Sequence, residues 1–339
     1  MPTPQPKKEL SRSDRLLKLL LAGQDKPQSG QALSEQLGVT RAAVWKEVEA
    51  LRQQGYRIES GTNRGYRLSG QPNTLEPALL RAASCGCAHP IVYLDSVDST
   101  LLYANRLVLD GAENGTVVLA DRQTAGVGRL GRSFASPAGV GIYLTMVLEP
   151  HCTVDRLGLL TSLAGLVVCE AISSLCGVSP ALKWPNDVIL QGKKVCGILT
   201  RLVSDAETAT VTHALVGIGV NVLQQEFPPE LSDKAISLWQ ATGIALPRAE
   251  LAARIVHGLT ESLITENWLQ APPADTVARL RALSCTLGKA VTVVSPTGSR
   301  QGVAEALDDS GGLLVRFAEG VELVSSGEVS VRGLLGYAE

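Results

Sequence analysis

Long apolar segments are missing from this chain of 339 residues. No apolar run reaches the ~18 residues that a helix needs to cross a bilayer, because Leu16–Ala22 is interrupted by Lys18 and stopped by Gly23. The segment Met1–Lys8 contains prolines and lysines but no apolar signal core. These absences predict a cytoplasmic protein with no membrane partner.

Cysteine is sparse, and its number is odd. The seven cysteines are scattered, and the grouping of Cys85, Cys87 and His89 has no second cluster to complete a metal site. Dispersed thiols of this kind indicate a reducing compartment rather than a disulfide framework. We therefore expect no structural metal.

The composition is that of a globular protein with more than one domain. Hydrophobic residues make up 45% of the chain, which at this length is enough to bury sizeable cores. The net charge of -2 hides an asymmetry. Residues 1–70 contain 12 Lys and Arg against 7 Asp and Glu, whereas the remainder contains 19 against 26. The basic excess therefore lies at the N-terminus.

The N-terminal segment has the pattern of a winged helix-turn-helix. A leucine-rich helix over Leu16–Leu21 is followed by a second helix, which Ser29 caps and Gly38 ends. Thr40 caps a third helix, and a hairpin with a basic tip comes next. We predict DNA binding by a helix-turn-helix spanning Gly30 to Glu49, through Arg41, Trp45, Lys46 and Arg64. The alternative is a helical module for protein contacts with a solvated basic face.

Composition also indicates the domain boundaries of an α+β multidomain protein. The polar, turn-rich stretch 69–77 predicts a linker after a first domain of residues 1–68. The long segment 78–285 alternates apolar strands and helices and carries the ligand chemistry. Closely spaced short strands over 286–339 predict a small C-terminal barrel.

A glycine-rich loop, Gly126–Arg132, organises the middle of the chain. Its glycines allow a ligand to approach the backbone closely, and Arg129 and Arg132 supply forked donors for carboxylate or phosphate oxygens. The spacing also satisfies a dinucleotide fingerprint, but a strand over Ile142–Val147, and not a helix, follows it. We predict an anion-binding loop between two strands; a hairpin with solvated arginines is the alternative.

Two further stretches carry polar groups that need partners. In Lys183–Asp187, a lysine, an asparagine and an aspartate surround Trp-Pro just before an apolar strand. A phosphate together with a divalent cation would provide partners for these three polar groups. After the next hairpin we expect Lys194 beside the ligand and Lys193 in solvent. The strand Ala214–Val222 contains two glycines that permit close approach. The hydroxyls of Ser99–Thr100, at a strand-to-helix corner, either bind a polar ligand or only cap the helix.

Together these motifs resemble those of the biotin–protein ligase family. The resemblance rests on Gln123–Arg132, Ser136-Pro137 with Gly139 and Gly141, Lys183–Asp187, Lys194 with Gly197–Leu199, and Gly217–Asn221. With the winged helix included, nearly the whole chain is similar to the bifunctional members, which are both biotin ligase and biotin-operon repressor. The resemblance implies a central mixed-sheet α/β ligase domain, like that of class II synthetases, and an SH3-like C-terminal β-barrel.

The resemblance also implies a two-step reaction with ATP and Mg²⁺. The biotin carboxylate attacks the α-phosphate to form biotinyl-5′-adenylate, and a lysine of a biotin carboxyl carrier domain then attacks this mixed anhydride. Biotin or its adenylate would contact Ser99, Thr100, Leu101, Gln123, Gly126, Val127, Gly128, Arg129, Lys194, Gly197 and Gly217. ATP and Mg²⁺ would contact Lys183, Asn186, Asp187 and Asn221, and the catalytic residues would be Arg129, Lys194, Asp187 and Lys183.

In the family's repressors, the bound adenylate promotes a homodimer that binds operator DNA. Three positions of this chain depart from the family pattern. Val127 stands where arginine is common, Leu101 where asparagine often follows the Ser-Thr pair, and Arg201 where an acidic residue is usual.

The alternatives are a lipoate or octanoate ligase, a DNA-binding sensor that uses biotin only as effector, and, last, a dinucleotide oxidoreductase.

Overall fold

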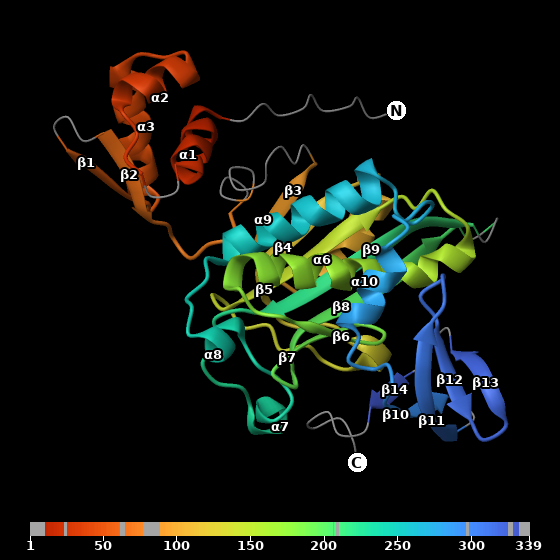
Figure 1. Ribbon diagram of the computed structural model, residues 1–339. Coiled ribbons are helices and arrows are strands. Elements are labelled where there is room, and N and C mark those ends of the chain that lie inside the picture. The colour runs from red at the N-terminus through yellow and green to blue at the C-terminus, as the bar shows by residue number, and fades with distance from the viewer. Residues whose placement is uncertain are drawn as a thin grey trace. The chain divides into compact units, whose positions relative to one another are not determined.

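The computed structural model describes residues 11–23, 26–61, 65–76, 80, 89–205, 207, 210–295, 298–324 and 328–331 (Figure 1). Two compact units make up the chain: Met1–Ala88 with Pro247–His257, and His89–Leu246 with Gly258–Glu339. The first unit contains the predicted winged helix, and the second contains the predicted ligand-binding and C-terminal segments.

Three N-terminal helices belong to the first unit, and each begins after a capping hydroxyl. They are α1 (Arg12–Ala22), α2 (Gly30–Leu37) and α3 (Arg41–Gln53). The side chains of Ser11, Ser29 and Thr40 each accept a hydrogen bond from the backbone N–H three residues further on. α2 ends at Gly38, whose φ of 66° is a left-handed conformation that glycine adopts without strain.

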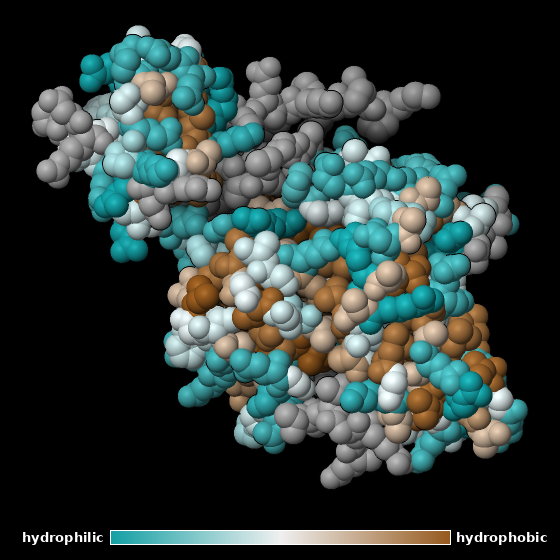
Figure 2. All heavy atoms as spheres, viewed as in Figure 1, coloured by the Kyte–Doolittle hydropathy of each residue, from teal (hydrophilic) through white to brown (hydrophobic). Residues whose placement is uncertain are grey.

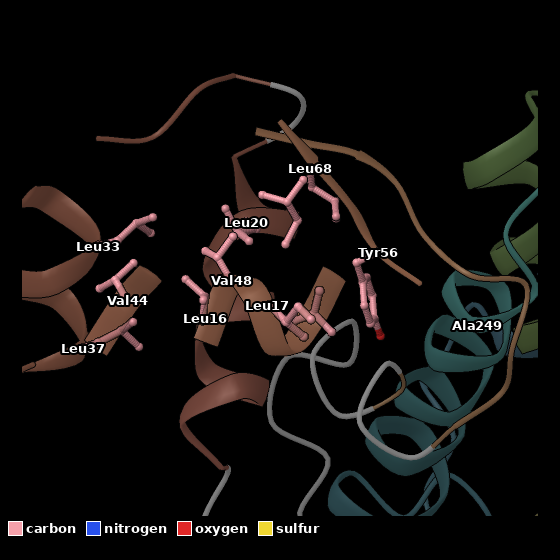
Figure 3. Close-up of a cluster of buried hydrophobic side chains, with 12 residues drawn as sticks. Leu16, Leu17, Leu20, Leu33, Leu37, Val44, Val48, Tyr56, Leu68 and Ala249 are labelled. Carbon is pink, nitrogen blue, oxygen red and sulfur yellow. The ribbon is translucent and has the colours of Figure 1, made fainter. Parts of the chain in front are cut away.

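The apolar faces of these helices form one core (Figure 3). Its buried members include Leu16, Leu17, Leu20, Leu33, Leu37, Val44, Val48 and Leu51. Ala249, from the start of α9 (Arg248–Leu259), belongs to the same core. Next to it, the guanidinium of Arg248 is only 1% exposed and donates from Nε to Oδ1 of Asn73 (2.7 Å) and from Nη2 to its carbonyl (2.9 Å). The predicted linker is therefore fastened to α9.

The wing is an antiparallel pair of strands, β1 (Arg57–Gly61) and β2 (Gly65–Gly70). Gln28 and Tyr66 exchange backbone hydrogen bonds, which adds a third short segment to the pair. Arg64, one of the predicted DNA contacts, lies outside the described residues. Figure 2 shows hydrophilic side chains over most of the visible surface of the helices and wing.

A seven-stranded mixed sheet is the centre of the second unit. In spatial order its strands are β3 (Ile91–Val97), β4 (Val117–Gln123), β5 (Gly141–Leu148), β9 (Val211–Asn221), β8 (Lys193–Ser204), β7 (Asp187–Leu190) and β6 (Ala181–Lys183). β3 and β4 are parallel, and all other neighbours are antiparallel. Because β9 lies between β5 and β8, segments distant in sequence become neighbours.

Helices α5 (Thr100–Leu109) and α6 (Leu159–Cys176) pack on this sheet. α5 contacts β4, β5 and β9, and α6, after the turn η2 (Val154–Gly158), contacts β6, β7 and β8. Among the described residues, Arg156–Cys176 is a helix long and apolar enough to cross a membrane. This finding differs from the prediction from the sequence that no apolar run has the length of a membrane span. Of the most apolar window of this helix, 67% is buried inside the protein, as in the core helix of a globular domain.

The rest of the second unit consists of short helices and a C-terminal sheet. The helices are α7 (Pro229–Ser232), α8 (Leu238–Thr242), the π-helical turn η3 (Thr260–Thr265) and α10 (Thr276–Leu283). The antiparallel strands are β10 (Ala290–Ser295), β11 (Gly298–Leu307), β12 (Leu313–Phe317), β13 (Gly320–Val324) and β14 (Glu328–Val331). Their order is β13-β12-β11-β10-β14, so β13 and β14 are opposite edges among the described strands.

Candidate functional site

β4, β5, β8 and β9, the start of α5 and the loop after β4 enclose an open cavity of about 460 Å³. Ten of the residues predicted to contact biotin or its adenylate line it: Ser99, Thr100, Leu101, Gln123, Val127, Gly128, Arg129, Lys194, Gly197 and Gly217. The eleventh, Gly126, is buried at the base of the loop. Arg129 and Lys194, which come from different elements, thus share one cavity.

The glycine-rich loop is a narrow hairpin between β4 and β5. The N–H of Phe134 donates to the carbonyl of Gly126 (2.8 Å), and the N–H of Gly128 donates to the carbonyl of Arg132 (2.6 Å). A Cβ on Gly126 would lie 2.4 Å from the carbonyl oxygen of Phe134, so a larger residue does not fit there. Close pairing at the base therefore explains why the loop begins with glycine.

The tip of the loop is the short turn η1 (Arg129–Gly131). Leu130 has a φ of 55°, a left-handed conformation that costs a non-glycine residue roughly 1–2 kcal/mol. Within this turn Arg129 is half-buried, and its Nη1 donates to Oδ1 of Asn186 (3.1 Å). Arg132, by contrast, is exposed. Only the first of the two loop arginines lines the cavity.

Hydroxyl and amide groups form the polar end of the cavity. β3 and β4 are parallel and end side by side, which brings Thr100 next to Gln123. Oε1 of Gln123 accepts from the N–H (2.8 Å) and the hydroxyl (3.1 Å) of Thr100, and its Nε2 donates to Oγ of Ser136 (2.8 Å). Thr145 donates to Oγ1 of Thr100 (3.0 Å). Ser99 is buried, lines the cavity and makes no capping hydrogen bond, so its hydroxyl does not cap α5.

Lys194, which lines the cavity, forms an ion pair with Asp187. Nζ of Lys194 lies 2.7 Å from Oδ1 of Asp187, and both side chains are largely buried. This oxygen nevertheless has no hydrogen bond of acceptable geometry, so the contact is electrostatic rather than an aligned hydrogen bond. The turn from Lys183 to Asp187, with a cis peptide between Trp184 and Pro185, positions the carboxylate.

Glycines on two adjacent strands form the floor. Gly197 pairs with Gly219, and Leu199 pairs with Gly217. The ring of Phe134 lies on Gly219, where a Cβ would come within 2.5 Å of it, and packs edge-on against Tyr143. Missing side chains on this floor therefore make room for protein groups as well as for a ligand.

Other predicted residues lie outside this cavity. Lys183 is buried and lines a second cavity of about 330 Å³, between the β6–β7 turn, α6 and α10, which shares Asn186 and Ile198 with the first. Asn221 is buried, and its Oδ1 accepts from Nε2 of Gln224 (3.1 Å). Asp187 does not line the first cavity itself, but it forms an ion pair with Lys194, which does. The ATP and Mg²⁺ roles of these residues remain predictions.

Several cavity residues were not predicted from the sequence. They are Phe134, Leu144, Ile198, Leu199 and Ile218 on the lining, with Ser136 and Thr145 behind it. Gly219, one of the two glycines predicted to permit close approach, lines the cavity together with Gly217, because alternate residues of a strand share a face. No sequence pattern indicates Phe134, because its ring lies in the cavity only as a result of how the glycine-rich loop folds.

Two buried thiols are unsuited to ligand chemistry. Burial raises the pKa of Cys169 to about 12 and also raises that of Cys196, so both stay protonated at neutral pH. In the described part of the chain, no group of three His, Cys, Asp or Glu residues could hold a metal ion. Cys85 and Cys87 lie outside it.

The outer face of α3 carries the other predicted site. Arg41, Trp45 and Lys46 are exposed, and the indole of Trp45 is 55% exposed although it is large and apolar. Arg52 is instead used within the domain, since it donates to the carbonyl of Ile58 (3.0 and 2.5 Å) and pairs with Glu49. The outer face of α3 is therefore basic and exposed, as in a recognition helix that can enter the major groove of DNA.

Three parts of the chain define its class. They are a winged helix-turn-helix, a mixed-sheet domain with two cations in one cavity, and a small C-terminal antiparallel sheet. The class is that of multidomain ligases with a DNA-binding module. Family models match these parts in order: an HTH domain over residues 12–67, the biotin/lipoate A/B protein ligase family over 93–221 and the biotin protein ligase C terminal domain over 286–332. The chain belongs to the biotin/lipoate A/B protein ligase family.

Known relatives cover most of the chain. The bifunctional ligase/repressor BirA of Bacillus spizizenii is 35% identical over 89% of this chain and 93% of its own. BirA of Escherichia coli is 29% identical over 94% and 96%. The solved structure of biotin protein ligase from Aquifex aeolicus in complex with biotin and ATP is similar with a TM-score of 0.61 and 32% identity, over 72% of this chain and 98% of that one.

Proposed function

We propose that the protein is an ATP-dependent biotin–protein ligase that also acts as a transcriptional repressor. The observation that carries the proposal is the meeting of Arg129 and Lys194 in one cavity that is also lined by Ser99, Thr100 and Gln123. Such a cavity suits a carboxylate joined by an apolar stem to a polar ring. The similar Aquifex ligase was solved with biotin and ATP, which supports the same substrates here.

In the first step, an oxygen of the biotin carboxylate attacks the α-phosphorus of ATP, and pyrophosphate leaves. Two negative groups converge in this transition state, so fixed cations stabilise it more than they stabilise the separate substrates. We assign Lys194 to the carboxylate and the α-phosphate. Arg129 is assigned to the phosphate of the resulting biotinyl-5′-adenylate, beneath the loop.

Biotin binds with its ureido ring at the polar end. Ser99, Thr100 and Gln123 offer hydroxyl and amide groups there, and two of them are already fixed by Thr145 and Ser136. The apolar body of biotin lies on the glycine floor beside Leu101 and Gly217. Fixed polar groups cost little reorganisation on binding, which favours affinity.

A carboxylate oxygen is a ligand that Mg²⁺ takes, and Asp187 supplies one beside Lys194. Because Nζ of Lys194 lies 2.7 Å from Oδ1 of Asp187, the ammonium moves from this oxygen to the substrate phosphate before the ion takes its place. Asp187 would hold the ion, with Lys183 and Asn221 serving ATP nearby. When bound, the ion offsets the charge of the triphosphate.

In the second step, the amine of an acceptor lysine attacks the carbonyl carbon of the adenylate, and AMP leaves. We take the acceptor to be a biotin carboxyl carrier domain, in keeping with the relatives' activity. The amine is nucleophilic only after it loses a proton, and we assign Asp187 to receive the proton or to stabilise the charge.

Repression would use the winged helix. Its match to the HTH model and the exposed Arg41, Trp45 and Lys46 support binding to operator DNA. We propose that biotinyl-5′-adenylate promotes a homodimer, so that two recognition helices meet two half-sites. Bound adenylate would thereby report the supply of biotin.

The architecture of the proposed ligase follows the family. We propose the boundaries 1–68, 69–77, 78–285 and 286–339, with the C-terminal sheet as an SH3-like barrel. The match of the C-terminal family model over residues 286–332 supports the last of these domains. We further propose that the protein works in the cytoplasm, where carboxylases and DNA are available together.

A second candidate substrate is lipoate or octanoate, because the matching family model covers both biotin and lipoate ligases. One experiment separates the two. The protein is incubated with ATP, Mg²⁺ and either biotin or lipoate, and the bound small molecule is identified by mass spectrometry. We expect biotinyl-5′-adenylate alone. A lipoyl adenylate would favour the second candidate, and no adenylate from either acid would refute the ligase function.

A further inference from the structure

We infer that Asn186 is a positioning residue, which holds Arg129 and with it the glycine-rich loop over the cavity before any ligand binds. This inference rests on the ligase function proposed above and assigns to Asn186 a role other than that of an ATP or Mg²⁺ ligand. It depends on how the two side chains meet across the cavity.

The side chain of Asn186 is fixed in orientation by its partners. Its Nδ2 donates to the carbonyl of Ile198 (3.1 Å), and its Oδ1 accepts from Nη1 of Arg129 (3.1 Å). A carbonyl oxygen can only accept and a guanidinium can only donate, so a rotated amide would lose both bonds. The backbone is held too, because the N–H of Ile198 donates to the carbonyl of Asn186 (2.9 Å).

Asn186, in the turn between β6 and β7, therefore presents to a cation on a loop an acceptor that is fixed to β8. The loop is closed at its base by the pairing of Gly126 with Phe134 and of Gly128 with Arg132, while its tip carries a left-handed Leu130. A bond between Arg129 at this tip and the side chain of Asn186, which is itself bonded to Ile198 of β8, restricts the tip. The loop then loses less conformational entropy when a ligand binds.

The same geometry disfavours metal binding by this amide. A divalent cation on Oδ1 of Asn186 would sit against the guanidinium of Arg129, and the two positive charges would repel each other. A guanidinium carries five N–H donors in a planar fork. One bond to Asn186 orients that fork and is compatible with bonds from the same group to phosphate oxygens.

Tryptic cleavage tests the contact without any catalysis. Trypsin cuts after Arg129 and Arg132, so the rate of cleavage in the ligand-free protein reports how often the loop opens. In Asn186→Ala we expect this cleavage to be about ten-fold faster, the effect of losing one hydrogen bond from a charged donor. The control is Asn114→Ala, which removes an acceptor for the N–H of Glu149 (3.0 Å) and should leave loop cleavage unchanged. Equal loop cleavage in Asn186→Ala and the wild type would overturn the inference.

A double-mutant cycle tests whether Asn186 acts through Arg129. The measured quantity is the rate at which labelled biotinyl-5′-adenylate leaves the protein in a chase. We expect release about ten-fold faster in Asn186→Ala, and no further acceleration when this change is added to Arg129→Ala. Effects that multiply in the double variant would overturn the inference. A wild-type protein that forms no adenylate would instead refute the ligase function, and the tryptic result would still decide the role of Asn186.

Discussion

The ammonium group of Lys194 reaches the carboxylate of Asp187 by crossing the backbone of Gly197. Asp187 lies opposite Gly197 in the β7–β8 pair, and a register shift follows before Ile189 lies opposite Lys194. A Cβ on Gly197 would be 2.8 Å from both Nζ and Cε of the lysine. In this structure the glycine therefore makes room for the lysine rather than directly for a ligand.

Gly197→Ala should consequently impair catalysis more than folding. The methyl group displaces the flexible end of Lys194, which can move without disturbing the sheet, but the ammonium then leaves its position. Since a misplacement of about 1 Å can cost ~10²-fold in rate, we expect biotin transfer to fall by one to two orders of magnitude with little change in melting temperature. Transfer to a carrier domain and thermal unfolding measure the two effects. Wild-type transfer would contradict this account of Gly197.

Lys194→Ala should lower the rate of biotin transfer by roughly 10²–10³-fold. The variant removes the cation that we assign to the carboxylate and α-phosphate, and loss of one such group typically lowers kcat by roughly 10²–10³-fold. The neighbouring Lys193→Ala is a matched control, because Nζ of Lys193 donates to the carbonyl of Ser232 (2.8 Å) on the protein surface. It should retain full activity. Unchanged transfer in Lys194→Ala would refute the assigned role.

Thr100→Val should weaken the binding of biotin but not that of ATP. Valine is nearly isosteric, yet it removes the donor to Gln123 and the acceptor for Thr145. A buried polar group left without its partner costs about 1–3 kcal/mol, so we expect KM for biotin to rise about ten-fold or more. The exposed Thr212, whose hydroxyl donates to the carbonyl of Val203 (3.2 Å), provides the control Thr212→Val. An equal rise in KM for ATP would argue against a biotin site at Thr100.

Leu33→Ala should destabilise the winged helix. Leu33 is fully buried in the core of α1, α2 and α3, and such truncations typically cost about 2–5 kcal/mol. Leu21→Ala, at a half-buried position packed on the same core, should cost less. Denaturant unfolding followed by circular dichroism compares the two. A larger loss in Leu21→Ala would mean that this core is packed differently.

Local pattern was enough to predict much of this protein. Capping residues and helical spacing predicted α2 and α3, and continuous apolar runs predicted the strands that flank the loop of Arg129. These features depend on residues close in the chain, so the sequence displays them directly. The family resemblance added which of the polar residues share a ligand.

Contacts between distant elements could not be predicted in the same way. The bond between Arg129 and Asn186 depends on β9 lying between β5 and β8, and on the register of the β7–β8 pair. Neither is encoded by local periodicity. The same holds for Lys183, which a motif places beside Asn186 but whose side chain lines a different cavity.

Trp184 shows what such a distant contact does. Its backbone N–H donates to Oγ1 of Thr286 and its indole Nε1 donates to the carbonyl of Gly311, both at 2.9 Å, so the turn that carries Asn186 and Asp187 is fastened to the C-terminal segment. The buried indole, and not a ligand, accounts for tryptophan at this position.

Trp184→Phe keeps an aromatic side chain, though a smaller one than indole, and leaves the carbonyl of Gly311 without its donor. The lost hydrogen bond alone should lower the free energy of unfolding by about 1–3 kcal/mol. Because the turn loses a fixed point, the rate of adenylate formation should fall as well. Trp268→Phe is the control, since its indole donates only to the exposed Glu266 (2.6 Å) and its loss should change stability by less than about 0.5 kcal/mol. Urea unfolding and pyrophosphate release measure the two effects. Full adenylate formation in a destabilised Trp184→Phe would show that this hydrogen bond supports the fold without positioning the turn.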